Sequence, residues 1–326
     1  MKKILLTGAA GFIGSNTASA LLRRGDTVVG VDNLNDYYDP ARKEANLEEV
    51  RASAPDVRKF IFHREDIRDE GAMDSLFAEH GFDAVIHLAA LAGVRASIDD
   101  PKLYLDVNLG GTLSLLEAAN RHGQPLFVFA STSSVYGRTK VIPFVETDRA
   151  DRPLAPYPAS KRAAELLGYS YFHLFGQNFT ALRFFTVYGR RGRPDMMAYK
   201  VLDNIFRGAE VPLYNNGQMH RDWTYVDDIV EGVIAAADRP LGYEIINLGR
   251  GQPTLLADFV GLIEKMAGKR SNLASKPMPA ADIEYTYANI YRAKELLGYA
   301  PKVTVERGVE EFWAWYRESV LKGEGR

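Results

Sequence analysis

The chain has 326 residues, of which 46% are hydrophobic and 25% are charged, a composition typical of a folded globular protein of about two domains. Its 40 basic and 42 acidic residues leave a formal net charge of −2, so no broad basic surface for nucleic acid or an anionic membrane is expected. The absence of cysteine excludes disulfides, thiol nucleophiles and cysteine-ligated metal centres. The chemistry must therefore depend on oxygen and nitrogen groups or on a cofactor.

No segment of the sequence is predicted to cross a membrane. The longest near-continuous apolar run, residues 84–94, contains His87 and is shorter than the ~18 residues that a membrane-spanning helix needs. Lys2 and Lys3 precede an apolar stretch, as in a signal peptide, but three glycines interrupt that stretch within residues 8–14. We therefore expect a cytoplasmic protein.

Short β-branched segments alternate with segments of helical periodicity through the first half of the chain. The predicted strands are Lys3–Thr7, Thr27–Asp32, Phe60–Glu65, Ala84–Leu88 and Leu126–Ser131. The predicted helices are Ser15–Arg24, Asp69–His80 and Leu103–His122, each followed by a glycine. This alternation predicts an α/β fold with a doubly wound parallel sheet of the Rossmann type.

The second half has a less regular pattern. Its predicted elements are helices at Tyr157–Phe175, Val226–Ala237, Leu255–Met266 and Val305–Val320, and strands at Thr180–Phe185 and Glu244–Leu248. We expect residues 1–180 to form the Rossmann domain, with residues 222–250 returning to it. Residues 181–221 and 251–326 are then expected to form a smaller, mostly helical substrate domain. Ligands of such folds bind outside the carboxyl ends of the strands.

Three glycines lie between the first predicted strand and the first predicted helix, in the sequence Gly8-Ala9-Ala10-Gly11-Phe12-Ile13-Gly14. The spacing departs from the strict G-x-G-x-x-G pattern, but glycine still permits a tight turn here. A pyrophosphate can then approach the backbone N–H groups around Phe12 and Ile13, at the positive end of the helix. The position between a strand and a helix predicts a dinucleotide site.

Acidic residues at the ends of the next two strands extend this predicted site. Asp32 stands 18 residues after Gly14, where a carboxylate can accept hydrogen bonds from both ribose hydroxyls and would repel a 2′-phosphate. Asn33 follows it, and Asp66 and Ile67 end the third strand where adenine would lie. A plain turn or cap is the structural alternative for these residues. The combination of the glycines with Asp32 favours NAD as the cofactor.

Tyr157 and Lys161 are four residues apart at the start of a predicted helix, so their side chains share one face. A nearby ammonium and a positively charged nicotinamide ring would both lower the pKa of the tyrosine, which could then act as a base. Tyr136 and Lys140 repeat this spacing, but Gly137 disfavours a helix there. We therefore predict that Tyr157 is catalytic and Tyr136 structural.

Hydroxyl groups crowd the end of the fifth predicted strand, in the sequence Ser131-Thr132-Ser133-Ser134. Such hydroxyls can hydrogen-bond a substrate oxygen while it changes between alcohol and ketone. The structural alternative is a turn or a helix cap made by the same side chains. That alternative leaves unexplained why four such residues stand at the active end of a strand.

Together these motifs resemble the extended short-chain dehydrogenase/reductase family, and within it the nucleotide-sugar epimerases. The resemblance covers nearly the whole chain and is greatest for UDP-glucuronate 4-epimerases. That similarity rests on residues 33–40 (NLNDYYDP), 183–189 (RFFTVYG) and 193–196 (RPDM). The resemblance implies that Thr132 is the catalytic hydroxyl, Tyr157 the base and Lys161 the residue that holds tyrosine and ribose.

The resemblance also implies the reaction: NAD-dependent epimerisation at C4, converting UDP-glucuronate to UDP-galacturonate through a transient 4-keto sugar with internal return of hydride. The residues implied to hold the C6 carboxylate of this UDP-sugar are Ser133, Ser134, Thr186 and Arg193. A planar guanidinium suits a carboxylate because it can form two parallel charged hydrogen bonds. The alternative for the arginines at 190, 191 and 193 is a solvated basic loop.

The nucleotide half of the substrate has weaker signals. By the resemblance Arg221 would bind the diphosphate and Asp282 the uridine ribose, although both could equally be surface ion-pair residues. A homodimer through the helices at residues 103–121 and 157–175 is likewise implied by the resemblance alone.

Other functions remain open at this point. One is epimerisation of neutral UDP-glucose and UDP-galactose, and another is decarboxylation of UDP-glucuronate, although related decarboxylases have a glutamate in the region of Ser133 and Ser134. A non-catalytic NAD-binding protein would not need Tyr157, Lys161 and Thr132. No metal is expected, because the six histidines show no ligand-like spacing.

Overall fold

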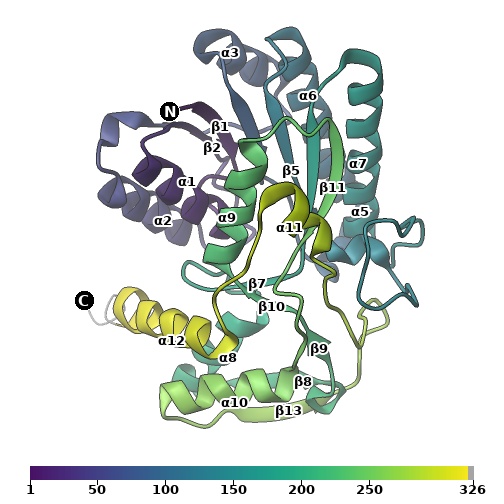
Figure 1. The fold of residues 1–326 in the computed structure, drawn as a ribbon. Coiled ribbons are helices and arrows are strands. Elements are labelled where there is room, and N and C mark those ends of the chain that lie inside the picture. Colours follow the sequence, from purple (N-terminus) through teal and green to yellow (C-terminus); the bar gives the residue numbers. More distant parts are fainter. Residues whose placement is uncertain (322–326) are drawn as a thin grey trace.

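The computed structural model describes residues 1–321 and contains a large α/β unit and a smaller unit, the latter in the lower part of Figure 1. The strands of the main sheet are β1 (Lys3–Thr7), β2 (Thr27–Val31), β3 (Phe60–His63), β4 (Ala84–His87), β5 (Leu126–Thr132), β6 (Phe179–Phe184) and β11 (Tyr243–Leu248). They are all parallel and lie in the order β11-β6-β5-β4-β1-β2-β3. The order reverses beside β1, which creates a crevice at the carboxyl ends of the strands. The predicted α/β class is confirmed.

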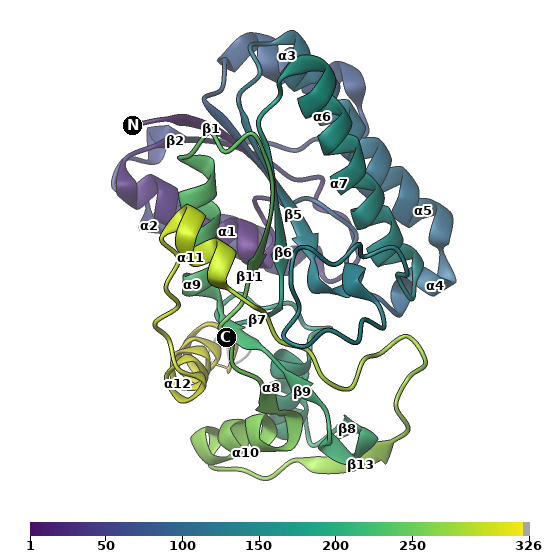
Figure 2. The same ribbon diagram turned by 45° about the vertical axis from the view of Figure 1, so that its right-hand side comes forward.

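Helices cover both faces of this sheet (Figures 1 and 2). One face carries α1 (Phe12–Arg24), α2 (Pro40–Ser53) and α9 (Val226–Ala237), and the other carries α3 (Glu70–His80), α6 (Gly111–Arg121) and α7 (Pro156–Phe175). Side chains of β1 alternate between two apolar cores, with Ile4 and Leu6 in one and Leu5 in the other. Because both faces are buried, the strands are continuous apolar runs in the sequence.

The smaller unit consists mainly of helices from the C-terminal half. These are α8 (Met197–Arg207), α10 (Leu256–Ala267) and α12 (Val305–Tyr316), and beside them β8 (Glu210–Tyr214) pairs with β13 (Asn272–Lys276). Short pairs of β7 (Thr186–Tyr188) with β10 (Trp223–Tyr225), and of β9 (His220–Arg221) with β12 (Thr254–Leu255), lie closer to the main sheet. The Trp223 ring stacks on Phe259 of α10 with ring centroids 3.8 Å apart, so aromatic packing joins these pieces.

The chain passes between the two units more than once. β6 is part of the main sheet as far as Phe184. The domain boundary predicted at residue 180 therefore falls inside this strand, and the large unit extends at least to Phe184. α9 and β11 belong to the large unit, and α11 (Tyr291–Leu297) packs against both of them. The predicted substrate segment 251–326 thus contributes one helix to the large unit. Local periodicity shows that a strand or helix exists, but not what it packs against.

The observed helices differ from the predicted ones at several places, and α2, α8 and α11 have no counterpart among the predicted elements. α2 is not predicted because its apolar stripe is weak, yet it has clear start signals, with Pro40 in its first turn and Asp39 accepting a hydrogen bond from Ala41 N at 2.9 Å. The predicted helix at 103–122 is in fact α5 (Pro101–Leu105), a π-helical turn (Asp106–Gly110) and α6 in succession. Such wide turns are frequent at functional sites. Within residues 1–321, none of the helices has both the length and the apolar character needed to span a bilayer.

Candidate active site

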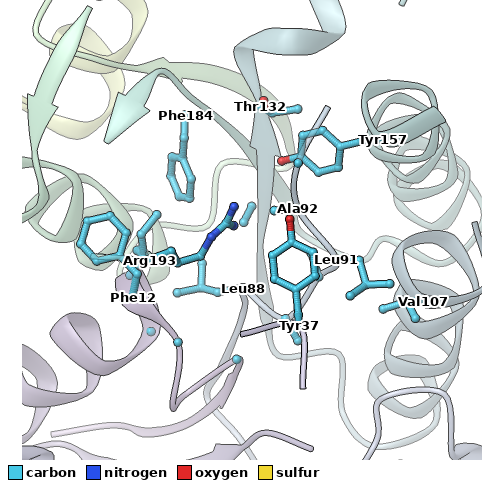
Figure 3. Close-up of a pocket in the computed structure, with 18 of the residues that line it drawn as sticks. Phe12, Tyr37, Leu88, Leu91, Ala92, Val107, Thr132, Tyr157, Phe184 and Arg193 are labelled. Carbon is cyan, nitrogen blue, oxygen red and sulfur yellow. The ribbon is translucent and has the colours of Figure 1, made fainter. Parts of the chain in front are cut away.

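A pocket at the carboxyl ends of the sheet strands brings together most of the predicted site residues (Figure 3). Those that line it are Gly8, Gly11, Phe12, Ile13, Gly14, Asp32, Asn33, Asp66, Ile67, Thr132, Ser133, Ser134, Tyr157, Lys161, Thr186 and Arg193. Arg221 and Asp282 are not among the lining residues. The dinucleotide, catalytic and carboxylate-binding predictions therefore converge on one cavity, and the predictions for the nucleotide half of the substrate do not.

The glycine turn has the geometry that a bound phosphate needs. Gly8 has a φ of +71°, and a Cβ added to Gly14 would lie 1.9 Å from the Gly8 carbonyl oxygen, so a side chain at either position is excluded. Gly11 caps α1 and offers no side-chain hydrogen bond to the first turn. The N–H groups at the start of α1 are thus available to an anion.

Asp32 lies at the end of β2 and is almost fully buried. Its two oxygens accept hydrogen bonds from Leu34 N at 2.9 Å and Ala10 N at 3.2 Å. Burial raises the pKa of Asp32, and these hydrogen bonds and the charge of Lys43 oppose the rise. The carboxylate is thereby fixed beside the glycine turn, where a ribose could be bound.

Asp66 has a different environment at the end of β3. Arg68 pairs with both of its oxygens, and Asn33 Nδ2 donates to Oδ2 at 3.0 Å. The Arg68 hydrogen bond lowers the pKa of Asp66 to about 2. Asp66 therefore holds Asn33 and the adjoining loop, which agrees with the turn alternative for this residue.

Tyr157 lies in the first turn of α7, and its hydroxyl is hydrogen-bonded to the Thr132 side chain (Figure 3). Thr132 Oγ1 also accepts a hydrogen bond from Ser134 N at 3.2 Å, so the capping alternative for this hydroxyl is real as well. Burial raises the pKa of Tyr157, and the Thr132 hydrogen bond and the Arg193 charge offset only part of the rise. The lowering that the sequence predicts is thus not provided by the chain alone, because burial outweighs these contributions.

Lys161 lies one turn after Tyr157 and is buried, with Nζ 4.6 Å from the centroid of the Phe129 ring. Within residues 1–321, Nζ has no hydrogen-bond partner. Burial lowers the pKa of Lys161 to about 7, against the opposing charge of Glu165. A buried amine without a partner is costly, and the hydroxyls of a cofactor ribose would satisfy it. The unpartnered Lys161 amine, the glycine turn and Asp32 together show that the residues of this pocket fit NAD.

A buried network supports the catalytic residues from behind. Glu165 of α7 accepts from Arg183 Nε and Nη2 at 2.9 and 2.8 Å, and from Ser131 Oγ at 2.5 Å. Arg183 in turn lies over the Tyr136 ring, and the Tyr136 hydroxyl donates to Asn247 Oδ1 at 2.7 Å. Tyr136 does not line the pocket. This network joins α7 to β5, β6 and β11, and it agrees with a structural role for Tyr136.

The predicted carboxylate-binding residues line the same pocket as Tyr157. Ser133 and Ser134 follow β5, Thr186 begins β7, and the Arg193 side chain points into the middle of the cavity (Figure 3). Arg193 pairs with Asp195 of its own loop. The three hydroxyls and the guanidinium can donate hydrogen bonds to an anion.

The neighbouring arginines have other partners, and the alternative of a solvated basic loop is wrong for them. Arg190 pairs with Asp227 through two hydrogen bonds of 3.0 and 2.6 Å. The buried Arg191 pairs with Glu49 at 2.7 Å and donates to the Ser15 carbonyl at 2.9 Å. These contacts dock the loop onto α1, α2 and α9.

Of the two residues predicted for the nucleotide half of the substrate, Asp282 forms an ion pair, as in the alternative that the sequence left open, whereas Arg221 donates to backbone carbonyls. Asp282 forms an ion pair of 2.7 Å with Arg95, whose guanidinium carbon lies 4.0 Å from the Tyr214 ring centroid. Arg221 Nη1 donates to the His220 and Glu284 carbonyls at 2.8 and 3.2 Å. Both side chains therefore have partners within the chain.

Sequence reasoning missed Asn108, the buried side chain of the π-helical turn. Its Oδ1 accepts from Leu91 N at 2.9 Å, and its Nδ2 donates to the Leu91 carbonyl and to Ser160 Oγ, both at 3.0 Å. It thus holds the loop after β4, which lines the pocket, against α7. A single asparagine in an apparently regular helical pattern gives no signal of this role. Within residues 1–321, no group of three or more potential metal ligands is gathered.

A Rossmann sheet, a glycine turn fit for a pyrophosphate and a tyrosine–lysine pair beside a threonine define a dinucleotide-dependent enzyme of the short-chain dehydrogenase/reductase type. Comparison with known proteins gives the particular family. The sequence pattern of the NAD dependent epimerase/dehydratase family matches residues 4–249. The chain belongs to this family and is an NAD-dependent epimerase.

Several relatives match almost end to end. The chain is 42% identical over 317 residues to a UDP-glucuronate 4-epimerase of Thermodesulfobacterium geofontis, covering 97% of this chain and 96% of the relative. The crystal structure of a UDP-glucuronic acid 4-epimerase from Bacillus cereus with UDP-glucuronic acid and NAD has a TM-score of 0.89 and 33% identity, with 97% and 99% of the two chains covered. The UDP-glucose 4-epimerase of Thermotoga maritima with UDP-glucose has a TM-score of 0.88 and 32% identity, with 98% and 99% covered.

Proposed function

We propose that the protein is a UDP-sugar 4-epimerase that interconverts UDP-glucuronate and UDP-galacturonate. The observation that carries this proposal is that Arg193, Ser133, Ser134 and Thr186 line the same pocket as Tyr157 and Lys161. A sugar whose C4 lies at Tyr157 would have its C6 carboxylate among these donors. The relatives named as UDP-glucuronate 4-epimerases support the same substrate.

In this proposal the chain handles the protons and the position of the sugar. When bound, NAD⁺ supplies the acceptor that takes hydride from C4 and returns it to the opposite face. Tyr157, as phenolate, takes the proton of the 4-hydroxyl, and Thr132 holds the C4 oxygen as it becomes a ketone. Lys161 binds the cofactor ribose and stabilises the phenolate by its charge. The 4-keto sugar rotates so that its opposite face is presented for reduction, and Tyr157 then returns the proton to the C4 oxygen.

The 4-keto intermediate of a hexuronate is a β-keto acid and can lose CO₂ when its carboxylate bond aligns with the ketone π-system. An epimerase must therefore hold the carboxylate out of that alignment. Fixed donors such as Arg193 and the hydroxyls of Ser133, Ser134 and Thr186 suit this purpose better than a mobile lysine. The lining residues that carry a carboxylate, Asp32, Glu65 and Asp66, are at the ends of β2 and β3, away from the sugar.

Epimerisation of neutral UDP-glucose and UDP-galactose is the second candidate. It is favoured by one specific observation, the pairing of Arg193 with Asp195, which leaves the pocket less positively charged than a free arginine would. The similarity to the Thermotoga maritima UDP-glucose 4-epimerase is compatible with it.

We also propose that the protein forms a homodimer through α5 and α7, which pack side by side. Large apolar side chains on these helices are exposed, among them Leu103, Leu105, Leu166, Tyr169 and Phe172. So many exposed apolar side chains on two adjacent helices are unusual on a monomer, and a second copy could cover those on one face by twofold symmetry.

The experiment that tests the function is incubation of the purified protein with UDP-glucuronate and NAD, followed by NMR spectroscopy of the products. We expect UDP-galacturonate to accumulate to equilibrium. Formation of a UDP-pentose would indicate decarboxylation instead. Turnover of UDP-glucose with no change in UDP-glucuronate would overturn the proposed acid-sugar substrate.

A further inference from the structure

Arg193 is already held by a carboxylate of its own chain. Its Nε and Nη2 donate to Asp195 Oδ1 and Oδ2 at 2.9 and 2.7 Å. This is the two-bond arrangement that a guanidinium forms with a bound carboxylate. An incoming acid sugar must therefore displace Asp195 or bind through the Nη1 edge of the guanidinium, which Asp195 does not use.

Tyr37 supports Asp195 from the cofactor side of the pocket. Its hydroxyl donates to Asp195 Oδ2 at 3.4 Å, and its ring centroid lies 5.6 Å from the Arg193 guanidinium carbon. Gly93 makes room for it, because a Cβ there would lie 2.7 Å from the Tyr37 hydroxyl oxygen. In Figure 3 the Arg193 guanidinium and the Tyr37 and Tyr157 hydroxyls point toward the same space.

Asp195 is charged in this arrangement. Burial alone would raise its pKa, but the hydrogen bonds and charge of Arg193 hold the pKa of Asp195 below its usual range. A sugar carboxylate at Arg193 would thus share one positive charge with a second carboxylate a few ångströms away. Like charges at that distance repel, so Arg193 attracts the sugar less strongly than an unpaired arginine would.

Weaker attraction has a use in epimerisation. Turning the 4-keto ring about its C1–C4 axis exchanges the C3 and C5 edges, so the carboxylate on C5 must leave its first partners before hydride can return to the other face. A bidentate ion pair with an unshared arginine would resist that step. Fixed orientation together with moderate strength is what the reaction requires.

We propose that Asp195, supported by Tyr37, is a specificity-determining and positioning residue, which holds Arg193 in one orientation and weakens its grip on the sugar carboxylate so that the ring can turn. This inference rests on the proposed function, in which the C6 carboxylate lies at Arg193. It predicts that removing the charge of Asp195 makes binding of the acid sugar tighter and turnover slower.

Binding can be measured without turnover by adding Tyr157→Phe to every variant and titrating UDP-glucuronate and UDP-glucose calorimetrically in the presence of NAD. We expect Asp195→Asn to lower the Kd of UDP-glucuronate by three- to tenfold and to leave the Kd of UDP-glucose unchanged. Tyr37→Phe should have a smaller effect in the same direction. In the enzyme with Tyr157 intact, Asp195→Asn should lower KM and kcat for UDP-glucuronate together, whereas general damage to the site would raise KM.

Asp227→Asn is the matched control, because Asp227 pairs with Arg190 in the same two-bond geometry outside the pocket. It should alter neither Kd. Unchanged or weaker binding of UDP-glucuronate by both Asp195→Asn and Tyr37→Phe would overturn the inference while the proposed function stands, provided that the unmutated protein converts UDP-glucuronate. If the unmutated protein does not convert it, the proposed function fails first, and this inference with it.

Discussion

Lys161 Nζ lies 4.6 Å from the centroid of the Phe129 ring, and within the described chain this buried amine has no hydrogen-bond partner. Because burial lowers its pKa to about 7 from the ordinary value of 10.5, the folded protein binds this proton less tightly than the unfolded chain does. Between those two pH values Lys161 carries its proton more often in the unfolded chain than in the folded protein. The contribution of Lys161 to the free energy of unfolding therefore rises with pH.

We therefore predict that the free energy of unfolding of the protein without NAD contains a contribution that increases from about pH 7 upward, by at most ~1.4 kcal/mol per pH unit. Urea unfolding measured at several pH values would reveal it. In Lys161→Met the contribution should vanish, and excess NAD should reduce it in the unmutated protein by providing the amine with partners. An identical pH dependence in Lys161→Met would show that other groups cause the rise.

Tyr157 and Tyr136 are each followed by a lysine four residues later, but removal of the hydroxyl should affect them differently. Tyr157→Phe removes the proposed base and should lower kcat by about 10²- to 10⁴-fold, while NAD binding persists. Tyr136→Phe should retain most activity but lose about 1–3 kcal/mol of stability, because Asn247 Oδ1 is left without its donor. Steady-state kinetics and thermal unfolding measure both effects. Loss of turnover only in Tyr136→Phe would reverse the assignment.

The residues that the sequence predicts correctly as pocket-lining are those whose role depends on a local pattern. The glycines, Asp32 and the pair on α7 are defined by strand ends and helical spacing, and parallel strands bring such ends to one edge of the sheet. Asn108 and Asp195 depend instead on contacts with residues distant in the sequence or with a neighbouring side chain, which no periodicity encodes. The sequence also gives no measure of how strongly burial raises the pKa of Tyr157 in the chain alone, since burial is a property of the assembled fold; the predicted lowering includes the charge of a bound nicotinamide ring and stays a prediction.

Cofactor choice should depend on Asp32. Asp32→Asn keeps a hydrogen-bond acceptor for the ribose but removes the charge that would repel a 2′-phosphate, and it leaves the nearby Lys43 ammonium without that counter-charge. We expect the affinity for NAD to fall and the NAD-to-NADP affinity ratio to decrease at least tenfold, as measured by cofactor fluorescence titration. Asp66→Asn is the control, because Arg68 already pairs with both oxygens of Asp66. The NAD-to-NADP affinity ratio of this variant should equal that of the unmutated protein.

Arg193 should discriminate between acid and neutral sugars. Loss of a charged hydrogen-bond partner costs about 1.5–3 kcal/mol, so Arg193→Ala should weaken UDP-glucuronate binding by roughly 10- to 100-fold and have little effect on UDP-glucose. The remaining turnover should release more UDP-pentose, because the carboxylate is free to align with the ketone. Arg190→Ala, which breaks an ion pair outside the pocket, should change neither quantity. Equal weakening for both sugars would contradict the assignment.

The exposed apolar side chains of α5 and α7 should control the oligomeric state. Leu105 and Leu166 are 43% and 54% exposed, and a charge at either position would be buried without a partner in a dimer formed through these helices. We predict that Leu105→Glu together with Leu166→Glu yields monomers in sedimentation velocity runs at concentrations where the unmutated protein sediments as a dimer. Leu273→Glu is a matched control, because Leu273 is 46% exposed but lies on β13 of the smaller unit. If the double variant still dimerises, or if Leu273→Glu alone dissociates the dimer, the interface lies elsewhere.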